Sequence, residues 1–166
     1  ENLYDSTYLK LDINNYKENI IGWNSSYTGE EISKKDMLEW RDEAITKIMN
    51  LKPQNILEIG SGSGLLLFNL LDKCCHYYAT DFSAHAIQYT EKAVKSIGCE
   101  EKVTSIKFTA DKIPFETLKN KFETLILNSV IQYFPSIDYL ENTLSKIIEN
   151  MSSPGQIFIG DIRDYR

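Results

Sequence analysis

The stretch 56–64 constrains the fold of this chain more than any other, because it joins an apolar run to a glycine-rich loop. Its sequence, ILEIGSGSG, places Glu58 inside the apolar run and Gly60, Gly62 and Gly64 at alternate positions after it. Glycine takes positive φ readily and lets the backbone approach a bound molecule, and the first N–H groups of a following helix are free to bind it. We therefore interpret the stretch as a buried strand that turns into a helix around a cofactor.

Strand and helix patterns alternate along the rest of the chain. Short apolar runs are typical of buried strands, and the segments between them carry apolar residues at helical spacing. The expected strands are 56–59, 77–80, 103–109, 124–130 and 156–159, and the expected helices are 34–51, 65–71, 84–97 and one that begins near 136. This alternation predicts an α/β fold, a Rossmann-like doubly wound parallel sheet in three layers, which binds ligands at the carboxyl ends of its strands.

Length, charge and cysteine spacing narrow the class of protein. A chain of 166 residues with 42% hydrophobic residues suits one domain with a sizeable core, and its net charge of −6 disfavours nucleic acid as a partner. We see no apolar run long enough for a membrane span and no leader, so we expect a cytoplasmic protein without a membrane partner. Cys74, Cys75 and Cys99 have neither disulfide nor metal-ligand spacing, so we expect reduced thiols and no metal site.

The first 35 residues are rich in aromatic side chains without clean periodicity, and they include the turn-rich run 22–29. Two interpretations are equally supported. In one, the aromatic residues cap the core; in the other, Trp23 and Tyr27 belong to a lid over the cofactor. We divide the chain accordingly into an N-terminal aromatic segment, 1–35, and a cofactor-binding core, 36–166.

Three acids indicate which cofactor the loop binds. Asp81 lies 21 residues beyond Gly60, at the end of the second strand, where a carboxylate can accept hydrogen bonds from both hydroxyls of a ribose. Glu58 precedes the loop, where a dinucleotide site needs no acid, and Leu65 stands where that site has a small residue. With Asp111 at the end of the third strand, these acids suit S-adenosylmethionine, a nucleoside with a positive centre, better than a pyrophosphate.

At these positions the sequence resembles class I S-adenosylmethionine-dependent methyltransferases, and among them the methyltransferase domains embedded in nonribosomal peptide synthetases and polyketide synthases. The resemblance runs over nearly the whole chain. It is carried by the segments 3–5 with 7–8, 22–30, 57–65, 80–83, 127–135 and 160–163. Each segment is modest alone, but in this order they are specific.

The resemblance implies a role for each residue of the site. The implied cofactor site comprises Glu58, Gly60, Gly62, Gly64, Asp81, Phe82, Ala110, Asp111 and Asn128, with Trp23 and Tyr27 from the lid. The three glycines would face the methionine portion, and Asp81 would hold the ribose. Phe82 would lie against adenine and Asp111 would hydrogen-bond the adenine amino group. For Phe82 the alternative is core packing, and for Asp111 it is a turn or a helix cap.

Asn128, Gln132 and Tyr133 are the candidate catalytic residues, because they end the fourth expected strand or follow it. By the resemblance Asn128 would lie beside the transferred methyl group. Gln132 and Tyr133 are placed to orient the acceptor, although Tyr133 suits packing equally well. Methyl transfer to an amine depends mainly on positioning, because an α-amino group is substantially neutral at cytoplasmic pH, whereas a carbon acceptor needs a base. We expect no catalytic role for His76 or His85.

These expectations combine into one predicted function: N-methylation of an aminoacyl group held as a thioester on a carrier protein, with neighbouring synthetase domains as partners. The alternatives are C-methylation of a carrier-bound polyketide intermediate and a cofactor-binding or docking module without catalysis. A complete methyltransferase of this class would continue into a further helix and an antiparallel strand pair, which we expect to be absent here. Since the chain also begins with Glu1, we expect a fragment of a longer polypeptide whose fifth strand is an open edge.

Overall fold

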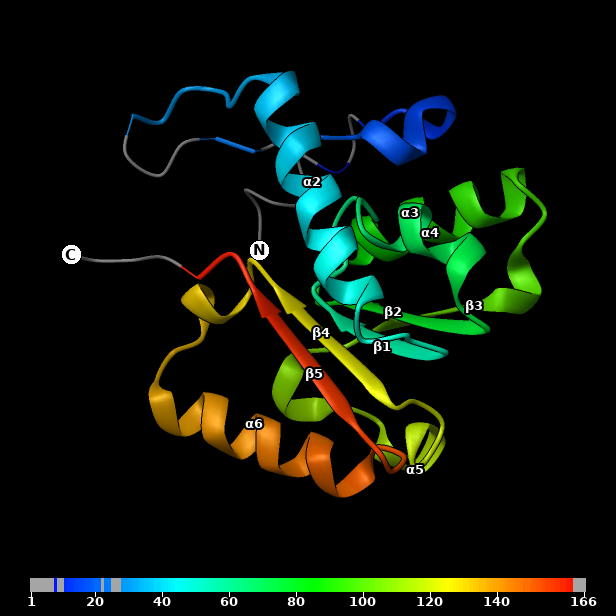
Figure 1. Ribbon diagram of the computed structural model, residues 1–166, viewed down its shortest axis with the longest axis vertical. Helices are drawn as coiled ribbons and strands as arrows, with labels where there is room; N and C mark the ends of the chain where they lie inside the picture. The colour runs from blue at the N-terminus through cyan, green and yellow to red at the C-terminus, as the bar shows by residue number, and fades with distance from the viewer. Residues whose placement is uncertain (1–7, 9–10, 22, 25–27, 163–166) are drawn as a thin grey trace.

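The computed structural model describes residues 8, 11–21, 23–24 and 28–162. Within them, five parallel strands form one sheet in the order β3–β2–β1–β4–β5 (Figure 1). The strands are β1 Asn55–Ile59, β2 His76–Asp81, β3 Val103–Lys107, β4 Thr124–Asn128 and β5 Gln156–Gly160. The strand order changes direction between β1 and β4, which is the point where doubly wound sheets bind their ligands. The predicted fold class is confirmed.

Helices cover both faces of the sheet. They are α2 Lys34–Met49, α3 Leu67–Leu70, α4 Ala84–Ser96, α5 Phe115–Leu118 and α6 Ile137–Asn150, with 3-10 turns η1 Ile13–Glu18, η2 Leu71–Lys73, η3 Glu100–Lys102, η4 Ala110–Lys112 and η5 Ile131–Tyr133. In Figure 1, α2, α3 and α4 lie on one side of the sheet, and α5 and α6 lie on the other. Among the described residues, no helix combines the length and the apolar character that crossing a bilayer requires.

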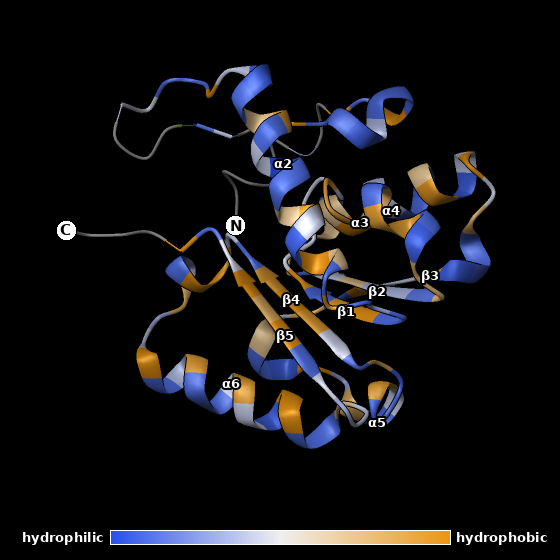
Figure 2. Cartoon of the chain, in the orientation of Figure 1, coloured by the Kyte–Doolittle hydropathy of each residue, from blue (hydrophilic) through white to orange (hydrophobic). Residues whose placement is uncertain are grey.

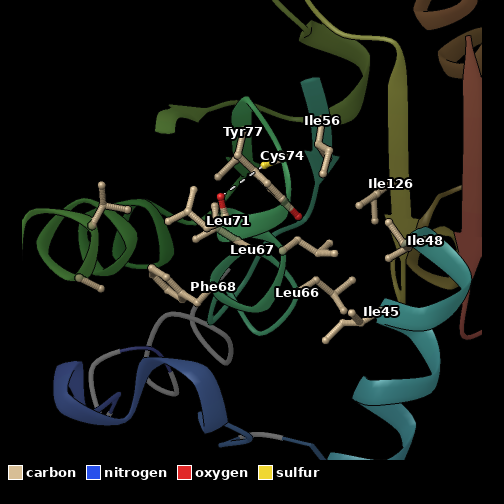
Figure 3. Close-up of a cluster of buried hydrophobic side chains, with 14 of the residues drawn as sticks. Ile45, Ile48, Ile56, Leu66, Leu67, Phe68, Leu71, Cys74, Tyr77 and Ile126 are labelled. Atoms are coloured by element: carbon tan, nitrogen blue, oxygen red, sulfur yellow. Dashed lines mark hydrogen bonds between the residues drawn. The ribbon is translucent and has the colours of Figure 1, made fainter. Parts of the chain in front are cut away.

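Alternation along the strands divides the core into two clusters. In β1, Ile56 packs with residues of α2, α3 and α4, whereas Leu57 packs with residues of α5 and α6. Figure 3 shows the first cluster, in which Ile48 of α2 lies beside Ile126 of β4 and Ile45 lies beside Leu66. Every residue of β4 is buried, and Figure 2 shows hydrophobic colour along most of β4 and β5. The strand that leads into the glycine loop is therefore fixed from both faces.

Serine hydroxyls cap the N-termini of the three long helices. The Ser33 hydroxyl accepts the N–H of Asp36 at 3.2 Å, and the Ser83 hydroxyl accepts that of Ala86 at 3.3 Å. At α6 the Ser136 hydroxyl accepts the N–H of Tyr139 at 3.1 Å. Each bond satisfies one N–H group that the first turn of a helix leaves without a partner.

Several elements are shorter than predicted; for example, the strand expected over 103–109 ends at Lys107. The helix expected over 65–71 is only the four residues of α3, followed by the 3-10 turn η2. The chain must turn back there to begin β2, where the N–H of Cys75 donates to the carbonyl of Gln54 at 2.7 Å. The strand expected over 124–130 ends at Asn128, because Ser129 takes a left-handed φ of 59° that no strand continues.

Glu123 fastens the start of β1 to the start of β4, at the end of the sheet opposite the glycine loop. Its carboxylate accepts the N–H groups of Gln54 at 2.7 Å and of Asn55 at 2.9 Å. The side-chain amide of Asn55 donates to the other carboxylate oxygen at 3.2 Å. We expect Glu123→Gln to lower the free energy of unfolding by about 1–3 kcal/mol, because this donor would face an amide NH2 instead of an acceptor. Urea denaturation measures the change. Glu116→Gln, on exposed α5, is the control, and an equal loss in both variants would contradict this assignment.

Candidate functional site

The glycine loop takes a backbone shape that requires its glycines. Gly60, Gly62 and Gly64 have φ of 78°, 52° and 73°, in the left-handed region. A Cβ at Gly60 would lie 2.5 Å from a methyl group of Val130, and a Cβ at Gly64 would lie 2.5 Å from the ring of Phe68. Both the conformation and the close neighbours therefore exclude side chains at these two positions.

Asp81, at the end of β2, holds the glycine loop in place. One oxygen of its carboxylate accepts the N–H of Gly62 at 2.8 Å, and the other accepts the N–H of Ser83 at 2.8 Å. The carbonyl of the preceding residue, Thr80, accepts the N–H groups of Gly60 at 2.8 Å and of Ser61 at 2.9 Å. The end of β2 thus sets the shape of the loop that follows β1.

Glu58 precedes the glycine loop by two residues and lies on the face of the sheet that α2, α3 and α4 cover. It does not line the cavity described next. Its carboxylate accepts the hydroxyl of Tyr77 at 2.8 Å. Burial raises the pKa of Glu58 to about 7; the bond from Tyr77 opposes this shift, and the charge of Asp81 adds to it. Glu58 is therefore a buried carboxyl that links β1 to β2 next to the loop, and its contact with a cofactor stays a prediction.

A cavity of about 440 Å³ opens at the carboxyl ends of β1, β2 and β4. It is lined by Tyr8, Ile59, Gly60, Asp81, Phe82, Phe108, Thr109, Ala110, Asp111, Ser129, Val130, Tyr133, Phe134, Pro135 and Tyr139. The structure thereby brings together five predicted cofactor residues, Gly60, Asp81, Phe82, Ala110 and Asp111, and one predicted catalytic residue, Tyr133. Its volume falls within the range of small-molecule sites.

The lining of this cavity fits a ligand that contains adenosine and carries a positive charge. Six of its fifteen described lining residues are aromatic. The two acids among them are Asp81, at the end of β2, and Asp111, in the turn η4 that follows the neighbouring strand β3. Among the described residues that line it, none is lysine or arginine, so it offers no cation to a phosphate. The residues present therefore suit S-adenosylmethionine better than a dinucleotide, as the sequence indicated.

Asp111 is held by a residue that the sequence analysis missed. The hydroxyl of Tyr139 in α6 donates to the Asp111 carboxylate at 2.9 Å and accepts the Asp111 backbone N–H at 3.0 Å. Hydrogen bonds from Thr109 and then from Tyr139 hold the pKa of Asp111 below its usual value, so the carboxylate is ionised. A tyrosine in the first turn of a helix carries no sequence signal that separates this role from packing.

The three predicted catalytic residues lie in different places. Tyr133 lines the cavity and is 56% exposed. Gln132 is half-buried, and its carbonyl oxygen has no hydrogen-bond partner among the described residues. Asn128 shares the face of β4 with Ile126, so alternation turns it toward α2, where it lines a second hollow of about 270 Å³ with Trp40.

The end of β4 is fastened to the end of β5 by side chains. The Asn128 amide donates to the Ser129 hydroxyl at 3.2 Å, and that hydroxyl donates to the Asp161 carboxylate at 2.6 Å. Gly160 leaves room for this arrangement, since a Cβ there would overlap the Asn128 carbonyl oxygen. Asn128 is therefore a rigid element of the strand end beside the cavity.

The N-terminal segment reaches the cavity through Tyr8, whose hydroxyl would lie 3.2 Å from a Cβ on Gly62. Tyr16 packs edge-on against Phe68 of α3, with ring centroids 5.1 Å apart, as an aromatic cap on the core would. Trp23 packs against Trp40 of α2 at 4.9 Å and does not line the cavity. The other predicted lid residue, Tyr27, lies outside the described residues. A lid over the cofactor stays a prediction.

Comparison with known sequences gives a consistent family. Residues 57–157 match a family model described as a methyltransferase domain. Peramine synthetase A from Epichloe festucae is 40% identical over 174 residues, which cover 99% of this chain and 6% of that protein. Chondramide synthase from Chondromyces crocatus is 38% identical over 164 residues, which cover 99% of this chain and 4% of that protein. The chain spans only a small part of the length of these curated relatives.

Solved structures share the fold. An N-methyltransferase from Bradyrhizobium japonicum matches with a TM-score of 0.64 and 18% identity over 78% of this chain and 72% of that one. The same enzyme in complex with S-adenosyl-L-homocysteine matches with a TM-score of 0.59 and 16% identity over 71% of this chain and 60% of that one. At such identities the likeness concerns the fold alone, and it confirms the Rossmann-like sheet.

The raised pKa of Glu58 predicts a pH dependence of stability. Between its ordinary value of 4.5 and about 7, folded Glu58 keeps a proton that the unfolded chain releases. Its contribution to stability is therefore fully present below the ordinary pKa and is lost as pH rises through 7. We expect the free energy of unfolding, relative to Glu58→Gln, to fall by about 3 kcal/mol across this window. Urea titrations at several pH values measure it, and parallel pH profiles for the two proteins would contradict the assignment.

Proposed function

The chain belongs to the methyltransferase-domain family, and from that premise we propose that it transfers a methyl group from S-adenosylmethionine to the α-amino nitrogen of an aminoacyl group. The acceptor is held as a thioester on a carrier domain of a nonribosomal peptide synthetase. The observation that carries the proposal is the cavity lined by six aromatic side chains, by Asp81 at the end of β2 and by Asp111 in the turn after β3. This chain matches 6% and 4% of the length of two synthetases. That match supports neighbouring synthetase domains as its partners.

Two carboxylates would recognise the two ends of the nucleoside. Asp81 is 3% exposed and already accepts two backbone N–H groups, so its carboxyl group is fixed where ribose hydroxyls would donate to it. Asp111 would accept the amino group of adenine, and Phe82, 37% exposed and lining the cavity, would lie against the ring. Gly60 and Gly62 would let the backbone approach the methionine portion.

When bound, S-adenosylmethionine supplies a methyl group on a positively charged sulfur. The acceptor nitrogen forms the new bond with its lone pair in line with the breaking carbon–sulfur bond, and its proton leaves to water. Tyr133, which lines the cavity, and Gln132, its neighbour in the chain, would orient the acceptor, and Asn128 would hold the end of β4 through its bond to Ser129. In this mechanism the rate increase comes mainly from holding the acceptor nitrogen in line with the methyl group, and a fixed strand end would help to hold it there.

A nitrogen acceptor fits this lining better than a carbon acceptor. A carbon acceptor requires removal of a proton by a base, whereas a neutral amine already has its lone pair. Among the described residues that line the cavity, none is a histidine, and both Asp81 and Asp111 are committed to hydrogen bonds. C-methylation and a module without catalysis remain the competing outcomes of the test.

The test is incubation of the protein, joined to its native synthetase neighbours, with labelled S-adenosylmethionine and aminoacyl-loaded carrier domain. We expect a mass increase of one methyl group on the aminoacyl chain, and fragmentation should place it on nitrogen. A methyl group on carbon would replace the proposed acceptor, and binding of the cofactor without any methylated product would overturn catalysis.

Asp81→Ala should abolish cofactor binding while the protein remains folded. The variant removes the acceptor of the ribose hydroxyls and also frees the N–H of Gly62. We expect S-adenosylhomocysteine to bind about a hundredfold more weakly or not at all, because two hydrogen bonds to a charged group are lost. Calorimetry measures binding, and circular dichroism verifies folding. Asp138→Ala, on the exposed first turn of α6, is the control, and unchanged binding by Asp81→Ala would refute this role.

A further inference from the structure

Tyr139 lies at the adenine side of the cavity although nothing in the sequence singled it out. We propose that Tyr139 is a positioning residue that fixes the Asp111 carboxylate for the 6-amino group of a purine, and so makes the site selective for adenine over 6-oxopurines. The inference rests on the proposed function and deepens it, because it assigns base selectivity to a residue that need not touch the cofactor itself.

The contact between Tyr139 and Asp111 has two points. The Tyr139 hydroxyl donates its only hydrogen to the Asp111 carboxylate at 2.9 Å, and the same oxygen accepts the Asp111 N–H at 3.0 Å. One hydroxyl therefore holds both the side chain and the backbone of Asp111. Asp111 itself is exposed in the short turn η4, and this bridge fastens that part of the turn to α6.

Tyr139 is itself held from two sides. Its backbone N–H donates to the hydroxyl of Ser136, the N-cap of α6, at 3.1 Å. Its ring meets the ring of Phe134 edge-on, with centroids 4.9 Å apart and an interplanar angle of 70°. The hydroxyl thus projects from a ring whose position is set by the first turn of a long helix. A group that is fixed beforehand positions its partner without paying for order at the time of binding.

The chemistry of the held carboxylate gives the selectivity. An ionised carboxylate only accepts hydrogen bonds, and its two oxygens offer about four acceptor positions. Tyr139 and Thr109 use part of this capacity, so acceptor positions remain for a donor from the ligand. The 6-amino group of adenine is a donor, whereas a 6-oxo group is an acceptor that would face the carboxylate with like polarity. Discrimination is sharp only when the carboxylate cannot rotate away.

The experiment compares, by calorimetry, two ligands that differ only at the 6-position of the purine and at its neighbour N1: S-adenosylhomocysteine, with an amino group and an unprotonated N1, and S-inosylhomocysteine, with an oxo group and an N1–H. We expect the unmodified protein to prefer the adenosine compound by tenfold or more. In Tyr139→Phe, which keeps the ring, its affinity should fall about tenfold, and affinity for the inosine compound should change less than twofold. Tyr8→Phe, which removes a hydroxyl beside Gly62, should leave the ratio of the two affinities unchanged.

A double-variant series separates positioning from general damage. If Tyr139 acts through Asp111, then Tyr139→Phe should add little to the loss of selectivity in Asp111→Asn, because the two changes remove one interaction. Equal weakening of both ligands in Tyr139→Phe, or an unchanged ratio, would overturn the inference while leaving the cofactor site intact. Failure of the unmodified protein to bind either ligand would instead overturn the proposed function, and with it this inference.

Discussion

The carboxylate of Asp81 joins two backbone segments, and the shape of the cavity depends on that junction. A carboxylate that is 3% exposed is stable only when polar groups surround it, and here the N–H groups of Gly62 and Ser83 do so. The same two bonds fix the glycine loop on one side and the start of α4 on the other. The junction therefore forms with the fold rather than with the ligand, and the site is organised before a cofactor arrives.

The buried pair of Glu58 and Tyr77 joins β1 to β2 in the core, next to the same loop. Their hydrogen bond of 2.8 Å links the neighbouring strands β1 and β2. Glu58 is the residue before the last one of β1, after which the glycine loop begins. The Thr80 hydroxyl adds a bond to the Glu58 carbonyl at 2.7 Å. The acid in an otherwise apolar strand thus has hydrogen-bond partners on the neighbouring strand and does not line the cavity.

Much of the fold could be predicted from periodicity, because strands buried on both faces and capped amphipathic helices leave clear patterns. The ends of elements could not, since they depend on single backbone conformations such as the left-handed Ser129. Short elements such as α5 contain too few residues for a period to be visible.

The candidate site divides in the same way. Positions that need one residue type for a backbone or a charge, such as Gly60 and Asp81, were visible in the sequence. Tyr139 was not, because its role depends on α6 returning to η4 across a separation of 28 residues. The direction of Asn128 follows from alternation with Ile126, but only once the structure shows which helices cover each face of β4.

The aromatic contact between Phe134 and Tyr139 joins the proposed acceptor side of the cavity to the side that holds Asp111. On one side of Phe134 the chain carries Gln132 and Tyr133, the proposed acceptor residues, and on the other it leads into the helix whose tyrosine holds Asp111. Under the proposed function, a synthetase in which residues 132–139 are exchanged so that a different amino acid is accepted would also have a changed affinity for adenine. Acceptor range and cofactor affinity are then inherited together when such modules recombine, and neither diverges without the other.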